Sequence, residues 1–181
     1  LKTLGMLSVM VHYGLFVPAQ NMEMALREFI FISIGDMQSI DMGLSTFGGE
    51  ILKLKEILKD ADNNGIILID ELARGTNPKE GYAISKAIIN YLKNKNSITM
   101  ITTHFDGLVD EDDIKHLQVQ GISPDDFRKI SELLEDKNKG VELLHEYMNY
   151  RLREIKEVKE VPKDAINISR LMGLDEIILK D

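Results

Sequence analysis

Two adjacent carboxylates, Asp70 and Glu71, directly follow the apolar run at residues 66–69. A buried strand with this ending delivers its first acidic residue to the C-terminal edge of an α/β sheet, where ligands bind. Asp70 could hold Mg²⁺ there through water, because this ion keeps much of its hydration shell. Glu71 could orient or deprotonate an attacking water molecule. The run has the form of a Walker B element, although a buried strand can also end in Asp-Glu at an ordinary surface loop.

The residues after the carboxylates make the pattern more specific. Leu72-Ala-Arg-Gly-Thr76 forms a tight glycine turn, and Asn77-Pro78 then opens a helix with proline in its first turn, where the missing N–H costs nothing. The next strand, at residues 97–103, ends at His104. If the two strands are adjacent, His104 lies near the carboxylates and could contact a γ-phosphate or its attacking water. A lone histidine at a strand end is more often structural, but this spacing favours a functional one.

A third candidate is the loop Leu44-Ser-Thr-Phe-Gly-Gly-Glu50, which leads into a helix. The hydroxyls of Ser45 and Thr46 and the amides of the first helical turn can bind an anion, which the helix dipole favours. An ordinary serine or threonine cap explains the same residues equally well. The loop therefore gains meaning only together with the carboxylates and the histidine.

Alternating strands and helices must position these candidates. Unbroken apolar runs, which are typical of a parallel sheet covered on both faces, predict buried strands at residues 29–33 and 66–69, and a third strand is predicted at residues 97–103. Helices are predicted before the first strand and between the strands. The helix that Pro78 opens is expected to bury five apolar side chains, those of Ala83, Ile84, Ala87, Ile88 and Leu92. This alternation predicts an α/β fold.

Beyond His104 the chain becomes more charged and more helical in pattern. Residues 110–113 form an acidic patch, which is typical of a solvated loop. The predicted elements, in order, are a strand at 114–120, a charged helix at 124–147 broken near Gly140, an element of undecided type at 150–158 and two short helices around Gly173.

The composition narrows the classes of function. The chain has 181 residues, 44% of them hydrophobic, which is enough for one domain with a real core. Its 22 basic and 30 acidic residues leave a formal net charge of -8, which argues against this segment being the main nucleic-acid-binding surface. The absence of cysteine excludes disulfides and fits a reducing cytoplasm. No apolar run approaches the ~18 residues of a membrane span, and a first residue other than methionine indicates a chain that begins inside a longer protein.

Three motifs, taken together, resemble the MutS family of ABC-type ATPases: STF at residues 45–47, LIDELARGT at 68–76 and TTH at 102–104. Residues 14–19 and 34–40 are more similar to the second bacterial branch of that family, which lacks mismatch-reading modules. The resemblance implies an α/β, ABC/P-loop NTPase-like layered sheet with flanking helices, followed by a mostly helical C-terminal segment. Residues 1–107 would be the ATPase core without its phosphate-binding loop. Residues 108–181 would be the remainder of the domain, with a charged helical insertion and closing helices.

The resemblance also implies ATP and Mg²⁺ as cofactors. It assigns roles to residues at the sheet edge that carries Asp70 and Glu71, called the carboxylate edge below. Asp70 is expected to hold Mg²⁺, Glu71 to act as the catalytic base, and His104 to act as the switch histidine. Three loops would take part as well: a signature loop that reaches across a homodimer to the partner's ATP, the loop after Walker B that relays between the two nucleotide sites, and a coupling loop. These loops comprise, in that order, Ser45, Thr46 and Phe47; Arg74, Gly75 and Thr76; and Asp36 and Gln38.

One motif of the family is absent from this sequence. It contains no G-x-x-x-x-G-K-S/T, the loop whose amides and lysine cradle the phosphates, and that lysine is expected just upstream of Leu1. The fragment alone is therefore expected to bind ATP weakly and not to turn it over.

Three functions compete. The family suggests a cytoplasmic, Mg-dependent ATPase that couples ATP binding and hydrolysis to the binding of DNA mismatches or junctions, as in mismatch repair, with the DNA held by modules outside this sequence. The second is a protein client, because GLSTFGGE and TTHFDG also resemble MutS-like ATPases that reactivate cobalamin-dependent amino-acid mutases. The third is a non-enzymatic interaction module; the intact Asp70-Glu71 pair and His104 argue against this function. The sequence leaves the client open, and no membrane partner is expected.

Overall fold

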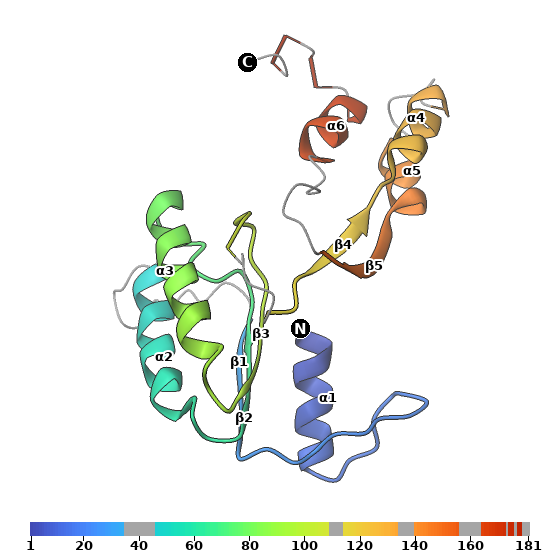
Figure 1. Cartoon of the computed structure of the whole chain (residues 1–181). Helices are drawn as coiled ribbons and strands as arrows, with labels where there is room; N and C mark the ends of the chain where they lie inside the picture. The colour runs from blue at the N-terminus through green and yellow to red at the C-terminus, as the bar shows by residue number, and fades with distance from the viewer. Residues whose placement is uncertain are drawn as a thin grey trace. The chain divides into compact units, whose positions relative to one another are not determined.

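The computed structural model describes residues 1–34, 46–108, 114–133, 140–155, 164–172, 174–175 and 177–178 (Figure 1). The chain divides into two compact units, Leu1–Leu108 and Val109–Asp181. The candidate residues of the carboxylate edge all lie in the first unit, so the two units are taken in turn.

The first unit is built on a parallel sheet. Its elements are α1 (Lys2–His12), β1 (Phe29–Ser33), α2 (Thr46–Asp60), β2 (Gly65–Ile69), α3 (Pro78–Leu92) and β3 (Ile98–Ile101). The strands pair in the order β1-β2-β3, and all three run parallel. Every residue of the central strand β2 is buried, as its unbroken apolar run predicts. The predicted α/β class, with a parallel sheet and flanking helices, is confirmed.

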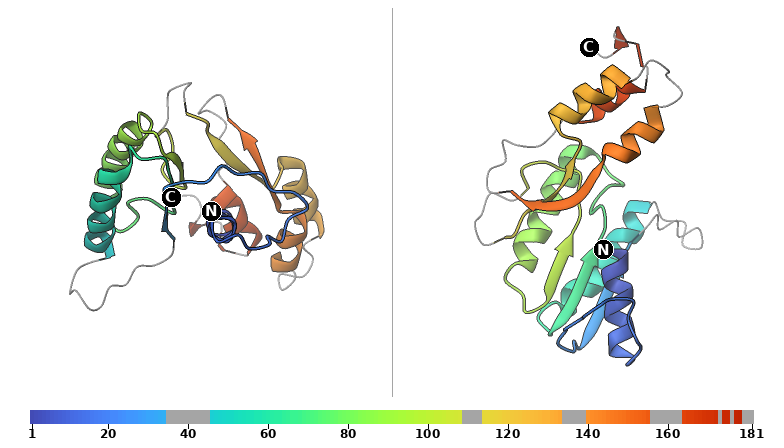
Figure 2. Two further views of the ribbon diagram at one scale, coloured as in Figure 1. Left: turned by 90° about the horizontal axis from the view of Figure 1, so that it is seen from below. Right: turned by 90° about the vertical axis from the view of Figure 1, so that its right-hand side faces the viewer.

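Helices cover both faces of this sheet. Two views show α2 and α3 on one face and α1 on the other (Figures 1 and 2). On the α1 side the backbones approach closely: a Cβ atom on Gly5 would lie 2.6 Å from the Cδ1 atom of Ile32 and 3.1 Å from that of Leu68. On the other side a buried cluster joins β2 to α2 and α3; it contains Leu54, Ile57, Ala61, Ile67, Ile69, Leu72, Ala73 and Leu92.

The buried face of α3 differs from the predicted one. Leu92 is buried, but Ala83 and Ala87 are exposed, and the other buried positions are Gly81 and Ser85. The Ser85 hydroxyl donates a hydrogen bond to the Leu72 carbonyl at 3.3 Å. Ile88 packs against the core as predicted, and Ile84 is half-buried. The prediction was wrong at Ala83 and Ala87 because it followed apolarity alone, whereas close approach to the chain after β2 selects small residues and a hydroxyl that can satisfy a buried carbonyl.

The described part of the second unit contains an antiparallel pair of strands and three helices. Its elements are β4 (Leu117–Gly121), α4 (Pro124–Leu133), α5 (Gly140–Tyr147), β5 (Asn149–Glu154) and α6 (Asp164–Leu171). Val119 of β4 pairs with Leu152 of β5, and the register is irregular between Val119 and Gly121. The undecided element at residues 150–158 is thus a strand where it is described, and the second of the two helices predicted around Gly173 lies largely outside the described residues.

A small separate core joins α4 and α5 in this unit. Ile122 and Ile130 are buried, and four partly buried side chains pack against them: Phe127, Leu144, Tyr147 and Met148. Across the described parts of the chain, no helix is long and apolar enough to cross a membrane.

Candidate active site

The end of β2 places Asp70 between the ends of its two neighbours. The Asp70 amide donates to the Ser33 carbonyl at 2.8 Å, and the Thr102 amide donates to the Ile69 carbonyl at 2.9 Å. The parallel hydrogen-bond pattern therefore continues one residue past each strand. As a result Asp70 lies half-buried at the C-terminal edge of the sheet, the position predicted for it.

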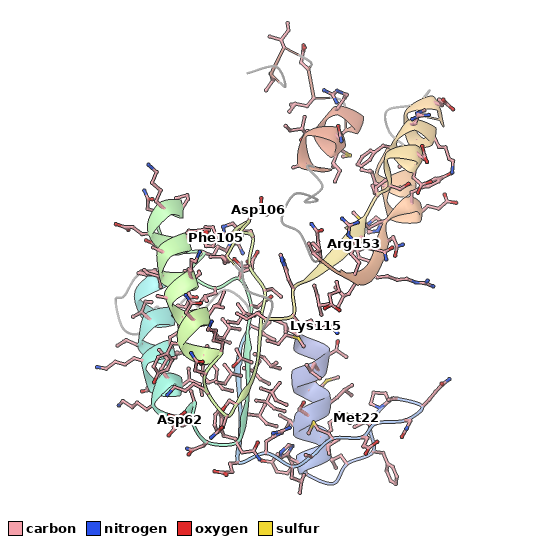
Figure 3. All side chains as sticks on the ribbon, viewed as in Figure 1. Met22, Asp62, Phe105, Asp106, Lys115 and Arg153 are labelled. Atoms are coloured by element: carbon pink, nitrogen blue, oxygen red, sulfur yellow. The ribbon has the colours of Figure 1, made fainter. Side chains whose placement is uncertain are left out.

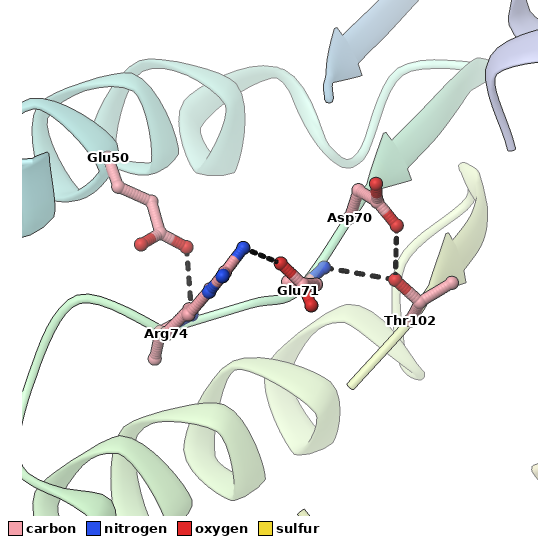
Figure 4. A network of polar contacts seen from close by, with 6 residues as sticks. Glu50, Asp70, Glu71, Arg74 and Thr102 are labelled. Carbon is pink, nitrogen blue, oxygen red and sulfur yellow. Dashed lines mark hydrogen bonds and ion pairs between the residues drawn. The ribbon is translucent and has the colours of Figure 1, made fainter. Parts of the chain in front are cut away.

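The side chain of Thr102 connects the two acidic residues (Figure 4). Its hydroxyl donates a hydrogen bond to Oδ1 of Asp70 and accepts one from the backbone amide of Glu71 at 2.9 Å. Sequence reasoning assigned a role only to the histidine of the TTH motif and missed this residue. The available signal was a hydroxyl at the end of the strand that neighbours the carboxylate strand.

The backbone turns sharply after Asp70 through two residues in the left-handed region. Glu71 has a φ of 52° and Ala73 a φ of 60°. Left-handed conformations cost non-glycine residues about 1–3 kcal/mol each and are found where the surroundings enforce them, often at functional sites. The turn buries Leu72 and Ala73 completely while the side chain of Glu71 stays exposed. It therefore presents Glu71 to solvent at the sheet edge.

Arg74 lies against Glu71. A guanidinium nitrogen of Arg74 forms an ion pair with Oε2 of Glu71 (Figure 4), and the Arg74 amide donates to the Glu71 carbonyl at 3.2 Å. Both side chains are largely exposed, so the ion pair is worth only about 0.2–1 kcal/mol. The ion pair orients the carboxylate of Glu71 rather than stabilising the fold. It brings together Glu71 and Arg74, two of the predicted site residues.

Glu50, near the start of α2, is a second residue that sequence reasoning missed. Its Oε1 atom accepts a hydrogen bond from the Ala73 amide at 2.8 Å. Burial raises the pKa of the Glu50 carboxyl above its ordinary value, and the Ala73 hydrogen bond acts in the opposite direction. The motif at residues 44–50 contained Glu50, but nothing in the local pattern showed that its partner lies on another element.

The start of α2 also contacts the predicted relay loop. A Cβ atom on Gly75 would lie 3.1 Å from the backbone nitrogen of Phe47 and 3.2 Å from its Cβ atom. Thr76 donates a weak hydrogen bond to Glu80 at 3.4 Å, and the Asn77 side chain caps α3 by accepting from the Lys79 amide. The other predicted loop residues, Asp36, Gln38 and Ser45, lie outside the described residues, as does the side chain of Thr46.

His104 follows β3 and is exposed. Its ring packs against Phe105 with a centroid separation of 4.3 Å. Phe105, which is labelled in Figure 3, in turn lies edge-on to Tyr82 of α3. The predicted adjacency of the two strands is present, because β2 pairs directly with β3. His104 therefore lies at the same end of the sheet as Asp70, two residues beyond Thr102.

The donor set at this edge suits magnesium better than softer metals. Asp70, Glu71 and Thr102 supply only oxygen atoms, and Mg²⁺ is usually held by one or two carboxylates together with water and substrate phosphates. Among the described residues, no group of three or more His, Cys, Asp or Glu side chains forms a closed metal site. The edge therefore fits an ion bound chiefly through water and an anionic substrate.

Comparison with known proteins agrees with this geometry. Residues 1–131 match the family described as MutS domain V. The chain is 43% identical over 106 residues to an endonuclease MutS2 of Staphylococcus epidermidis, 42% over 109 residues to one of Acetivibrio thermocellus, and 45% over 106 residues to one of Lachnospira eligens. These alignments cover 58%, 60% and 58% of this chain but only 14% of each relative.

The family match covers both the carboxylate edge and the elements that build it. It begins with α1, includes all three parallel strands and ends within α4. Because it extends over most of the 181 residues, the chain belongs to the MutS domain V family.

Proposed function

We propose that this chain is part of an ATPase domain of the ABC type, and that the protein to which it belongs couples ATP hydrolysis to DNA binding. The observation that carries the proposal is the arrangement of Asp70 and Glu71 on the hydroxyl of Thr102, at the C-terminal edge of a parallel sheet. Membership of the MutS domain V family supports it, and the names of the curated relatives favour the second bacterial branch.

Asp70 and Glu71 divide the proposed chemistry between them. Asp70 would hold Mg²⁺, and the bound ion would neutralise charge on the phosphates. Glu71 orients the attacking water and accepts its proton. Arg74 keeps the Glu71 carboxylate in place before substrate arrives. His104, at the same end of the sheet, contacts the γ-phosphate.

The proposal also includes a nucleotide-dependent homodimer. Ser45, Thr46 and Phe47 form the signature loop toward the partner's ATP, and Asp36 and Gln38 the coupling loop. Support comes from the close contact of Phe47 with Gly75, which joins the start of α2 to the relay loop of Arg74, Gly75 and Thr76.

DNA contact is assigned to parts of the protein outside this sequence. The net charge of -8 makes this segment a poor binder of phosphate backbones. The sequence also lacks the G-x-x-x-x-G-K-S/T loop, so this chain by itself binds ATP weakly and does not turn it over. Reactivation of an amino-acid mutase and a non-enzymatic role receive no support from the relatives' names. A cytoplasmic location remains part of the proposal.

The test is to add about 40 upstream residues, enough for a strand and a phosphate loop at ordinary element lengths, and to measure ATP hydrolysis with and without DNA. We expect Mg-dependent hydrolysis that junction or mismatched duplex DNA stimulates and that Glu71→Gln abolishes. Hydrolysis that is indifferent to every DNA contradicts the DNA part. Equal hydrolysis by the Glu71→Gln variant contradicts the assignment of the base.

A further inference from the structure

Glu50 satisfies a buried backbone group in the turn that carries Glu71. Ala73 is only 1% exposed, so its amide has no access to water and needs a partner within the protein. Oε1 of Glu50 is that partner, at 2.8 Å (Figure 4). A carboxylate acceptor makes a stronger hydrogen bond to an amide than a neutral acceptor does. One side chain of α2 thus holds the chain that follows β2.

The bonded residue lies in the strained part of the turn. Ala73 has a φ of 60°, and Glu71, two residues earlier, has a φ of 52°. Such conformations persist only where neighbouring groups enforce them. If the acceptor for the Ala73 amide is removed, the turn can relax toward ordinary backbone angles and satisfy that amide elsewhere. Relaxation would move Glu71, because both residues belong to the same turn.

A second contact joins the same two elements. The backbone of Phe47, in the first turn of α2, lies so close to Gly75 that a Cβ atom there would be 3.1 Å from the Phe47 nitrogen. Glu50 is one helical turn further along α2. The first turns of α2 and residues 71–75 are therefore held at two points, and a displacement of one is transmitted to the other.

We infer that Glu50 is a positioning residue: by accepting the Ala73 amide it maintains the left-handed turn that presents Glu71, and it couples the start of α2 to that turn. The catalytic part of this inference rests on the proposed function. The structural part concerns this chain alone, so each can be tested separately.

The structural part is tested by amide hydrogen exchange at Ala73 in the 181-residue chain. Glu50→Ala removes the acceptor and should accelerate exchange about tenfold or more, the ratio expected for one lost hydrogen bond to a buried amide. Glu50→Gln keeps an acceptor oxygen and should exchange at nearly the original rate. Glu50→Asp retains the charge but withdraws the carboxylate by one methylene group, so it should also accelerate exchange at Ala73. It serves as the test variant if Glu50→Ala does not fold. Glu56→Ala, at an exposed position of the same helix, is the control.

The catalytic part is tested in the longer protein that hydrolyses ATP. Glu50→Ala should lower kcat about tenfold or more with little change in KM, because misplacement of the base affects the reaction more than nucleotide binding. Glu50→Gln should restore kcat, which a general loss of charge would not allow.

The exchange and hydrolysis measurements contradict different parts of the inference. If Ala73 exchanges equally in Glu50→Ala, Glu50→Asp and Glu56→Ala, the positioning inference is overturned whatever the enzyme does. If exchange accelerates while kcat stays unchanged, Glu50 maintains the turn but does not position the base. If the longer protein hydrolyses no ATP, the proposed function fails, and the exchange measurement alone decides the structural part.

Discussion

A single hydroxyl serves both acidic residues of the site. Thr102 accepts the Glu71 amide and donates to the Asp70 carboxylate. It thereby fixes the direction in which the chain leaves β2 and the rotamer of the residue assigned to Mg²⁺. A threonine that makes two such bonds is a structural part of the site, even though it carries no charge.

Replacing Thr102 by valine should slow ATP hydrolysis by the longer protein by about tenfold or more, because small misplacements of catalytic groups are costly. Thr102→Ser keeps the hydroxyl and should retain most of the activity. Steady-state rates at saturating ATP provide the measurement. A valine variant with unchanged kcat would show that the hydroxyl does not position the carboxylates.

Strand β3, which ends just before Thr102, offers a matched control. The hydroxyl of Thr99 is buried and has no hydrogen-bond partner in the described part of the chain. Thr99→Val should therefore leave ATP hydrolysis unchanged. It should not lower the free energy of unfolding either, because it replaces an unsatisfied hydroxyl by a methyl group of nearly the same shape.

The stability of the chain should depend on pH through Glu50. Burial raises the pKa of Glu50 above its ordinary value of 4.5, with the Ala73 hydrogen bond as a smaller opposing effect. The folded chain then holds this proton more tightly than the unfolded chain. The stabilisation is fully present below pH 4.5 and is lost as the pH rises through the raised pKa.

Glu50→Gln cannot lose a proton, so its free energy of unfolding relative to the original chain should increase as the pH rises above about 4.5 and then level off. Urea unfolding at a series of pH values measures this difference. Glu56→Gln should show no such rise. A difference for Glu50→Gln that is constant with pH would contradict the raised pKa.

At the scale of elements, α2 and the turn after β2 form one packed unit. The contact at Gly75 is made by backbone as well as side-chain atoms of Phe47, at 3.1–3.3 Å. Backbone atoms cannot rotate away from an added methyl group as the end of a long side chain can. The close approach of these two elements therefore depends on glycine at this position.

Gly75→Ala should lower the free energy of unfolding by about 1 kcal/mol, a typical cost of overpacking. Gly49→Ala, in the same region of α2, meets no atom within 4 Å and should instead raise it by about 0.5–1 kcal/mol, because alanine favours the helix. Chemical denaturation distinguishes the two signs. A neutral Gly75→Ala variant would show that α2 can move away without cost.

At the scale of the whole molecule, family membership extends beyond the unit that contains the carboxylates. The match to MutS domain V includes Leu1–Leu108 and continues into the second unit as far as residue 131. The alignments to the curated relatives cover only 14% of their length. The DNA-dependent activity proposed here is thus a property of a larger protein, to which this segment contributes the carboxylate edge.

Several features were predictable because local patterns report them directly. The strands β1 and β2 were found from their apolar runs; β2 is buried throughout, as expected for a strand covered on both faces, whereas β1 is only partly buried. The start of α3 followed from Asn77-Pro78, whose cap forms as expected. Strand β5 was not decided, because its side chains are mostly exposed: Tyr150 is 65% and Leu152 61% exposed. Without a buried face, neither period dominates the sequence.

In the first unit, the sequence by itself determined the kinds of element, their order and the two acidic residues at the end of β2. Only the tertiary structure decided which other residues support them. Thr102 and Glu71 are separated by 31 positions, and Glu50 and Ala73 by 23. Local periodicity extends over one element, whereas these hydrogen bonds join different elements whose approach depends on packing across the sheet and on small residues such as Gly75 and Gly81. The position of the two acidic residues at the sheet edge was therefore predictable, and the residues that hold them in place were not.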